Sequence, residues 1–364
     1  NWTLSDIQCS GASENTIITI GGEGDFDPGD QGVTIDLADG DAIVCTFVND
    51  ADGSITVTKV TDPSGSAQIF DFSGAITASL TDGQTSTAIL VPPGNYAVTE
   101  GAVAGWDVTN ITCSDDDSTG TGSTANFVVA PGEVVDCTFT NTIQRGNIVV
   151  EKQTDPDGSS QLFDFITSYS GGFSISDGQQ NDSGPLLPTS EAGTYSVSES
   201  LPAGWELTSA TCSDGSSADA IDLAPGETVT CVFTNTIQRG NIIVQKVTDP
   251  DTSTEDFGFV TSYGSPFLLM NGEQNDSGEL LPTSEAGTYS VVEDDTLGWD
   301  KTSAICDDGS DPTAIDLGPG ETVTCVFTNT IQRGNIIVQK VTDPDTSTED
   351  LSLIHISEPT RPFT

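Results

Sequence analysis

The chain is a succession of short segments in which apolar and polar residues alternate, and no window shows a helical period. Examples are NIIVQKV, FGFVTSY, PFLLM, GTYSVVE, DKTSAIC and TVTCVFTN, which are separated by turn clusters such as DPDTS, NGEQNDSG and PGE. Each segment is typical of a half-buried β-strand. The pattern therefore predicts an all-β protein built from sandwich units of about seven strands.

These segments recur along the chain at a spacing of about 94 residues. The segment IQRGNIIVQKVTDPDTSTED starts at Ile237 and again at Ile331, and an earlier copy, IQRGNIVVEKQTDPDG, starts at Ile143. A more diverged copy, GSITVTKVTDPSG, starts at Gly53. Such periodicity is the mark of tandem domains. The predicted first, second and third repeats cover residues 53–143, 144–237 and 238–331.

The two ends of the chain depart from whole repeats. Residues 1–49 match only the second half of a repeat, because Trp2 stands where Trp106 stands in the first repeat and VCTFVN stands where DCTFTN stands. We therefore expect residues 1–49 to be the C-terminal half of a truncated repeat and residues 332–350 to be the start of another. Residues 351–364, LSLIHISEPTRPFT, leave the pattern and are expected to be a non-native, adapter-derived tail.

The net charge of the chain makes some classes of binding partner unfavourable. Its 56 Asp and Glu residues against 9 Lys and Arg residues give a formal net charge of −47, which repels nucleic acid and anionic lipid. No apolar run is long enough to cross a membrane. We expect neither a nucleic-acid partner nor direct membrane insertion. The acidity indicates either a solvated extracellular surface or the binding of divalent cations such as calcium.

Metal and cofactor signals are weak. Asp-rich turns and loops such as DPDG, DPDT, CSDDDS and CDDGSD resemble calcium loops, but none has the EF-hand spacing. No CxxC pair and no histidine-bearing spacing favours zinc. We therefore expect no metal site and no cofactor, with calcium as the one ion left open.

The eight cysteines fall as four pairs, one pair per repeat, which predicts a disulfide in each repeat and an oxidising compartment, extracellular or at the cell surface. The alternative is a set of reduced core cysteines. The expected pairs are Cys9 with Cys45, Cys113 with Cys137, Cys212 with Cys231, and Cys306 with Cys325.

Three polar residues fall on the apolar faces of predicted strands. In the first strand of the first repeat, Ile55, Val57 and Lys59 share one face, and the same alternation turns Glu100 of YAVTE and Asn141 of CTFTN inward. The diverged first repeat keeps all three residues, so recent duplication does not explain them. The corresponding residues are Lys152, Glu199 and Asn235 in the second repeat, and Lys246, Glu293 and Asn329 in the third.

Lysine is otherwise nearly absent, since four of the five lysines (Lys59, Lys152, Lys246 and Lys340) occupy this one position. An unpaired buried charge costs several kcal/mol, so the lysine and glutamate must pair or become neutral. A neutral amine can attack the asparagine carbonyl while a protonated glutamate assists, which releases ammonia and leaves an amide bond. The alternative is a Lys–Glu salt bridge with the asparagine as its hydrogen-bond partner.

The motifs ITVTKVTDPSG, VPPGNYAVTEGAVAGW and CTFTNT resemble those of the Cna B-type and SpaA-like prealbumin-fold repeats of bacterial surface proteins and pilins. The resemblance covers residues 1–350. It implies tandem prealbumin-like, immunoglobulin-like β-sandwich repeats of about 94 residues, each closed by a Glu-assisted Lys–Asn isopeptide bond between the residues named above. Asn49 and Lys340 match bonds whose other members are missing from the chain. The paired cysteines depart from many members of this family and leave open a disulfide-stapled variant with an unreacted triad.

These observations predict a structural stalk or extracellular fibre component rather than an enzyme. The only histidine, His355, lies in the suspect tail, and every cysteine has a partner, so a Ser–His or Cys–His nucleophile is excluded. The expected partners are neighbouring repeats and other copies of the chain in a fibre. The alternatives are an adhesin-type binding module for glycan, protein or calcium, and accessory repeats of a secreted enzyme.

Overall fold

The structure is a computed structural model that describes residues 1–22 and 24–338. The chain divides into two compact units, Asn1–Gln238 and Arg239–Thr364. Strands make up almost all of the regular structure, which confirms the all-β prediction. Two four-residue helices, α1 (Thr189–Ala192) and α2 (Thr283–Ala286), were not predicted, because one turn is too short to produce a helical period. Lys340, the tail at 351–364 and most of 332–350 lie outside the described residues.

Residues 1–51 form two small antiparallel sheets. Trp2 is 72% exposed, whereas Trp106, its counterpart in the first repeat, is 9% exposed and packs edge-on against Phe70 with ring centroids 5.4 Å apart. Phe70 belongs to a part of the repeat that has no counterpart in residues 1–51. The first sheet pairs β1 (Trp2–Ser10) with β4 (Val44–Ala51), and the second pairs β2 (Ile17–Ile20) with β3 (Val33–Asp36).

The first repeat is a sandwich of two sheets, ordered β10-β13-β5-β8 and β11-β12-β9-β6-β7. Side chains from both sheets, among them Val57, Phe72, Val98 and Phe139, form one buried core. Its nine strands exceed the expected seven. They are β5 (Gly53–Asp62), β6 (Phe70–Gly74), β7 (Ala78–Leu80), β8 (Ile89–Val91), β9 (Gly94–Glu100), β10 (Trp106–Cys113), β11 (Thr119–Thr121), β12 (Thr124–Val129) and β13 (Val134–Ile143).

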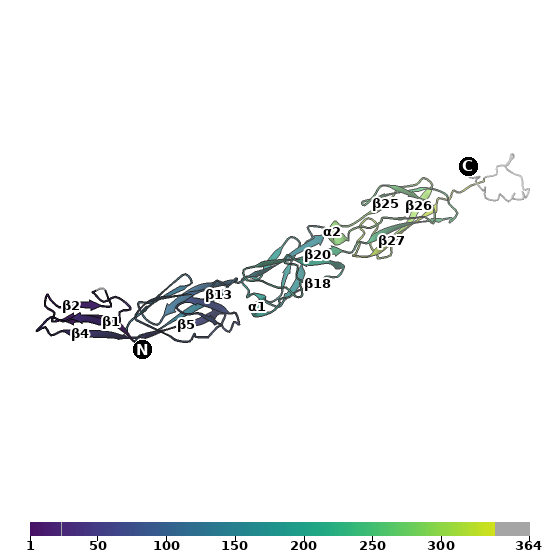
Figure 1. Ribbon diagram of the computed structural model, residues 1–364. Helices are drawn as coiled ribbons and strands as arrows, with labels where there is room; N and C mark the ends of the chain where they lie inside the picture. Colours follow the sequence, from purple (N-terminus) through teal and green to yellow (C-terminus); the bar gives the residue numbers. More distant parts are fainter. Residues whose placement is uncertain (23, 339–364) are drawn as a thin grey trace, which may run out of the picture. The chain divides into compact units, whose positions relative to one another are not determined.

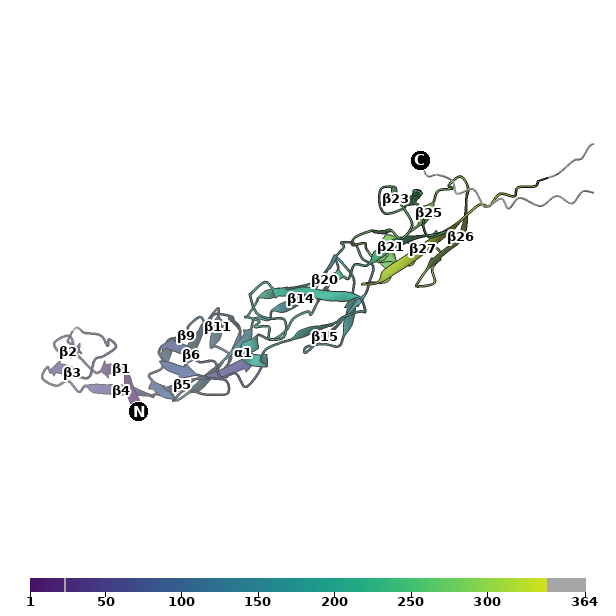
Figure 2. The ribbon, with the colours of Figure 1, turned by 90° about the vertical axis from the view of Figure 1, so that its right-hand side faces the viewer.

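The second and third repeats share a simpler seven-strand plan. A four-stranded sheet, β17-β14-β20-β19 or β24-β21-β27-β26, lies over a three-stranded one, β16-β15-β18 or β23-β22-β25. Figure 2 shows β14 and β20 side by side, with β15 in the other layer. The strands of the second repeat are β14 (Asn147–Asp155), β15 (Phe163–Thr167), β16 (Phe173–Ile175), β17 (Gln180–Asp182), β18 (Val197–Ser200), β19 (Trp205–Cys212) and β20 (Thr228–Ile237). Those of the third are β21 (Asn241–Asp249), β22 (Phe257–Thr261), β23 (Phe267–Leu269), β24 (Gln274–Asp276), β25 (Val291–Glu293), β26 (Trp299–Cys306) and β27 (Thr322–Ile331).

The first and last strands of every whole repeat are parallel neighbours. Figure 1 labels this pair, β5 and β13, in the first repeat. In the first repeat the register pairs Lys59 of β5 with Phe139 of β13, and Thr61 with Asn141. Two strands about 80 residues apart along the chain therefore meet in the middle of one sheet, and each turns alternate side chains into the core. This pairing decides which inward polar residues meet.

A glycine is required where the chain enters the first strand of the second repeat. A Cβ on Gly146 would lie 2.5 Å from the carbonyl oxygen of Glu227, and Gly240 stands in the same relation to Glu321 in the third repeat. Real Cβ atoms do not approach oxygen that closely, so Gly146 and Gly240 let the first strand of their repeats start against the loop that precedes the last strand.

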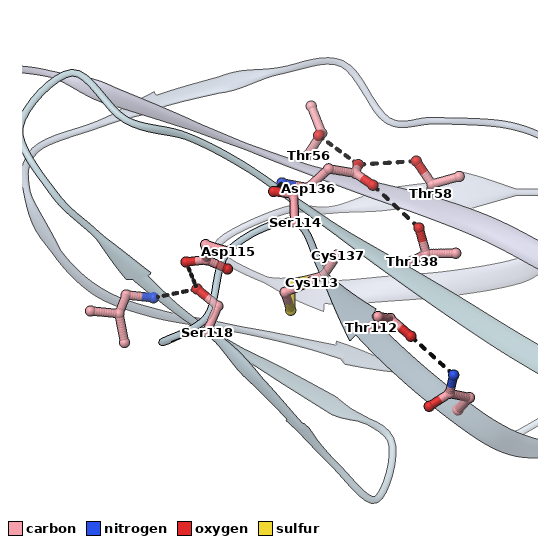
Figure 3. The surroundings of a disulfide bond; sticks show 12 residues. Thr56, Thr58, Thr112, Cys113, Ser114, Asp115, Ser118, Asp136, Cys137 and Thr138 are labelled. Carbon is pink, nitrogen blue, oxygen red and sulfur yellow. Dashed lines mark hydrogen bonds between the residues drawn. A yellow bond between two sulfur atoms is a disulfide. The ribbon is translucent and has the colours of Figure 1, made fainter.

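Disulfides join the last strand to its antiparallel neighbour. Cys113 of β10 lies directly opposite Cys137 of β13, and Figure 3 shows this bridge beneath a polar cluster in which Asp136 accepts hydrogen bonds from Thr56 and Thr58 at 2.7 and 3.0 Å. The structure joins the four pairs expected from the sequence. Cys9–Cys45, Cys113–Cys137, Cys212–Cys231 and Cys306–Cys325 enclose sequence separations of 36, 24, 19 and 19 residues.

Candidate functional site: buried lysine, glutamate and asparagine triads

The lysine of each triad is fully buried. The strand β5 alternates between buried and half-buried positions from Gly53 to Thr61, so Lys59 must face the core, and its exposed fraction is 0%. Lys152 of β14 and Lys246 of β21 are equally inaccessible. Lysine is almost never found so deeply buried without a partner. Something in each core must therefore compensate for its one buried amine.

Glutamate and asparagine meet the lysine in the first repeat. Lys59 Nζ donates a hydrogen bond to Asn141 Oδ1 at 2.8 Å and lies 3.8 Å from Glu100 Oε2. Asn141 Nδ2 donates a short hydrogen bond to Glu100 Oε1. Glu100 comes from β9 in the facing sheet, whereas the other two residues come from neighbouring strands of one sheet. The structure thus brings together the three residues that alternation placed inward.

The other two repeats bury the same three residue types, but the hydrogen bond from lysine to asparagine recurs only in the third. Lys246 Nζ lies 3.0 Å from Asn329 Oδ1 and 3.3 Å from Glu293 Oε1. In the second repeat Lys152 Nζ lies 3.6 Å from Glu199 Oε1 and donates to the carbonyl oxygen of Phe233 at 3.1 Å. The amide of Asn235 and the carboxyl of Glu199 have no hydrogen-bond partner there. Unsatisfied buried polar groups are costly, so this arrangement of the second triad lowers the stability of its core.

A phenylalanine ring completes each site. Lys59 Nζ lies 4.3 Å from the ring centroid of Phe70, and Lys152 and Lys246 lie 4.2 Å from those of Phe163 and Phe257. A cation held over an aromatic face is stabilised by about 0.5–2 kcal/mol. The sequence prediction missed these rings, although a phenylalanine at the same place in every repeat was a visible signal.

Burial shifts the acid–base equilibria of the triads toward the neutral forms. It lowers the pKa of Lys59 to about 8, although the Glu100 and Asp82 carboxylates raise it. It also lowers the pKa of Lys152 and of Lys246 against the opposing effect of their glutamates. The pKa values of the three glutamates rise for the same reason, with the lysines lowering them. A neutral amine beside a protonated carboxyl group is the combination that acyl transfer to an amide requires.

The end of each lysine-bearing strand is held by a side chain from a neighbouring turn. In the second repeat Asp177 accepts the backbone N–H groups of Thr154 and Gly158 at 2.6 and 2.8 Å. Asp82 does the same in the first repeat. Asn271 takes the position in the third repeat and accepts the N–H of Thr248 at 2.8 Å. A neutral amide therefore replaces the carboxylate without loss of the turn.

Because Asn271 stands in the third repeat where Asp177 stands in the second, we predict that alanine and asparagine at position 177 will have different effects on stability. Asp177→Ala should destabilise the second repeat by about 1–3 kcal/mol, because two N–H groups lose their acceptor, whereas Asp177→Asn should cost less than about 1 kcal/mol. Burial favours a raised pKa for Asp177, but the hydrogen bonds from Gly158 and Thr154 outweigh it and hold the pKa below the usual value. The carboxylate's contribution is therefore present above the ordinary aspartate pKa and is lost as the pH falls below it. Urea unfolding at several pH values would check the effects of the two variants and the pH dependence. Equal midpoints for the alanine and asparagine variants would contradict the role of Asp177 as an acceptor for the two N–H groups.

The remaining candidates of the sequence analysis lie elsewhere. Asn49 is exposed on β4, without a lysine. The carboxylates of Asp115 and Asp117, in the loop after β10, and of Glu133, just before β13, offer oxygens within 4.8 Å of one another, the kind of set that calcium binds. Exposed acidic groups gather commonly without an ion, so calcium stays an untested prediction. No helix among the described residues is long and apolar enough to cross a membrane.

Comparison with known proteins gives the family of this architecture. The profile of the prealbumin-like fold domain family matches residues 55–143 and 148–237. These two repeats are prealbumin-like domains. The match confirms the family and the fold class expected from the sequence motifs, and the third repeat shares the sheet order of the second. No curated protein matches the chain.

Several solved structures resemble these prealbumin-like domains. The TIE protein of Bacillus anthracis is 14% identical, with 90% of this chain and 68% of that chain covered and a TM-score of 0.48. Two B repeat units of the collagen-binding protein of Staphylococcus aureus are 15% identical, with 87% and 93% covered and a TM-score of 0.25. The major pilin protein T-13 of Streptococcus pyogenes is 13% identical, with 52% and 97% covered and a TM-score of 0.26.

Proposed function

We propose that the chain is a structural segment of an extracellular surface protein, a stalk or fibre component, in which each prealbumin-like repeat is closed by a Lys–Asn isopeptide bond and a disulfide. The observation that carries the proposal is the buried triad, repeated in all three whole repeats with lysine and asparagine on the first and last strands. A salt bridge alone would leave each repeat with a costly pair of buried charges.

The proposed reaction uses only the residues of the triad. The Asn141 amide first turns over, so that its carbonyl oxygen accepts a hydrogen bond from the protonated Glu100. The lone pair of Lys59 Nζ then attacks the Asn141 side-chain carbon. A new C–N bond forms, the original bond to Nδ2 breaks, and Glu100 relays the proton lost by Nζ to the departing nitrogen, which leaves as ammonia. Glu100 ends in the state in which it began. Positioning in a dry core supplies most of what such a reaction needs.

The position of the bond supports a load-bearing role. The chain enters each repeat along its first strand and leaves along its last, and the proposed bond ties these two strands near their C-terminal ends. Tension between the ends of a repeat would then pass through a covalent amide rather than through the hydrogen bonds of the sheet. Disulfides in every repeat fit an extracellular location. The partners proposed are neighbouring repeats and other copies in a fibre.

Intact mass tests the proposal. After reduction of the disulfides, the full chain is expected to weigh less than its sequence by three molecules of ammonia, one for each triad. Peptide mapping should find Lys59 linked to Asn141, Lys152 to Asn235 and Lys246 to Asn329, with the exposed Lys301 unlinked as an internal control. A full sequence mass and no Lys–Asn peptide would show that the triads are polar core networks only.

A further inference from the structure

The fifth lysine of the chain stands beside the third triad. Lys301 is the one lysine outside the first-strand position, and it lies on β26, antiparallel to β27. The register pairs it with Asn329, the asparagine of that triad. The ladder shifts between Lys301 and Ser303, as at a β-bulge. A second amine thus borders the residue that would accept the isopeptide bond.

The other repeats have an apolar side chain at this position. Val108 lies opposite Asn141 in the first repeat, and Leu207 lies opposite Asn235 in the second. Val108 lines a cavity of about 290 Å³ together with Glu100 and Asn141. In the first repeat the side chain at this position therefore borders the space next to the reacting groups. An apolar residue there adds no charge, whereas a lysine adds one.

The charges that face Glu293 differ accordingly from those in the other repeats. Burial raises the pKa of Glu293, and Lys246 on β21 and Lys301 on β26 both lower it. Among the described residues, the only cation that acts on Glu100 or Glu199 in this way is the lysine of its own triad. In the third repeat the neutral Asn271 stands where Asp82 and Asp177 carry a negative charge near their lysines. The positive charge of Lys301 therefore has no such carboxylate to offset it.

Resting on the proposed isopeptide function, we propose that Lys301 is a positioning residue that slows the third bond: its ammonium group favours the ionised form of Glu293 and so withholds the proton that the reaction between Lys246 and Asn329 needs. Lys301 acts through Glu293 and forms no bond itself. The first and second repeats have Val108 and Leu207 in place of Lys301, so no second lysine slows their bonds.

The test follows each cross-link in the full chain. The protein is made by cell-free translation, samples are quenched in acid at intervals, and the linked peptides are quantified by mass spectrometry. Lys301→Met, which keeps the length and removes the charge, should form the Lys246–Asn329 bond several-fold faster than the unmodified chain, whereas Lys301→Arg should leave its rate unchanged. Val108→Lys should slow the Lys59–Asn141 bond. The rate should fall at high pH as Glu293 ionises, and Lys301→Met should move that fall to higher pH.

The outcomes separate this inference from the proposed function. Bonds that form in the first and second repeats, with an equal or slower third bond in Lys301→Met, would overturn the role of Lys301 and leave the isopeptide function standing. Equal acceleration by Lys301→Arg would also overturn it, because packing rather than charge would be responsible. A Lys301–Asn329 peptide would make Lys301 a nucleophile instead. Absence of every cross-link would overturn the proposed function itself.

Discussion

Replacing Glu199 by alanine is expected to leave the second repeat unlinked and to destabilise it more than any other single change considered. Apart from the mass change of the substitution itself, the intact chain should be heavier by one ammonia than the fully linked chain, because the other two repeats keep their bonds. The bond would close a loop of roughly 80 residues, which the chain-entropy model values at about 4–5 kcal/mol. Lys152 would stay an amine and would be left in the core without the carboxyl group that lies 3.6 Å away in the structure, at a cost of about 3–5 kcal/mol.

Two further variants separate these contributions. Glu206→Ala removes an exposed glutamate from β19 in the same repeat and should change neither the cross-link nor the unfolding midpoint by much. The double variant Lys152→Met, Glu199→Leu removes both buried charges, so it should be more stable than Glu199→Ala although it is equally unlinked. Denaturant unfolding measures the stability of each variant, and limited proteolysis then identifies the repeat that has unfolded. A linked and fully stable Glu199→Ala protein would show that the glutamate is not needed.

Loss of the disulfide in the second repeat should have the next largest effect. Replacing Cys212 and Cys231 by alanine opens a loop whose ends are 19 residues apart, which corresponds to about 3 kcal/mol on the chain-entropy model. Because the bridge lies between β19 and β20, only the second repeat should unfold earlier.

The matched control is the same pair of substitutions at Cys113 and Cys137, which should shift the unfolding of the first repeat alone. Alkylation of the folded, unreduced protein should find no free thiol, since all eight cysteines are paired in the structure. Free thiols in the folded protein, or identical midpoints with and without the cysteines, would contradict a stabilising disulfide in each repeat.

The sequence was enough to place the triad residues on the inward faces of their strands. Side chains alternate across a strand with a period of two, so a run such as ITVTK fixes Lys59 on the side of Ile55 and Val57 whatever the strand pairs with. The repeats and the pairing of cysteines were equally visible, because they are patterns of identity and spacing. The additional hairpin of β11 and β12 was not, since β11 has only three residues, all of them exposed, and so carries no alternation, although β12 alternates between buried and less buried positions.

Only the tertiary structure decided which inward residues meet. The parallel pairing of β5 with β13 puts Lys59 2.8 Å from Asn141, and the packing of the second sheet brings Glu100 to both. These contacts join residues far apart along the chain, so they depend on strand order and register, which local alternation does not encode. Lys301 shows the difference most clearly. In the sequence it is a single exposed lysine, and the antiparallel register of β26 and β27 alone sets it opposite Asn329.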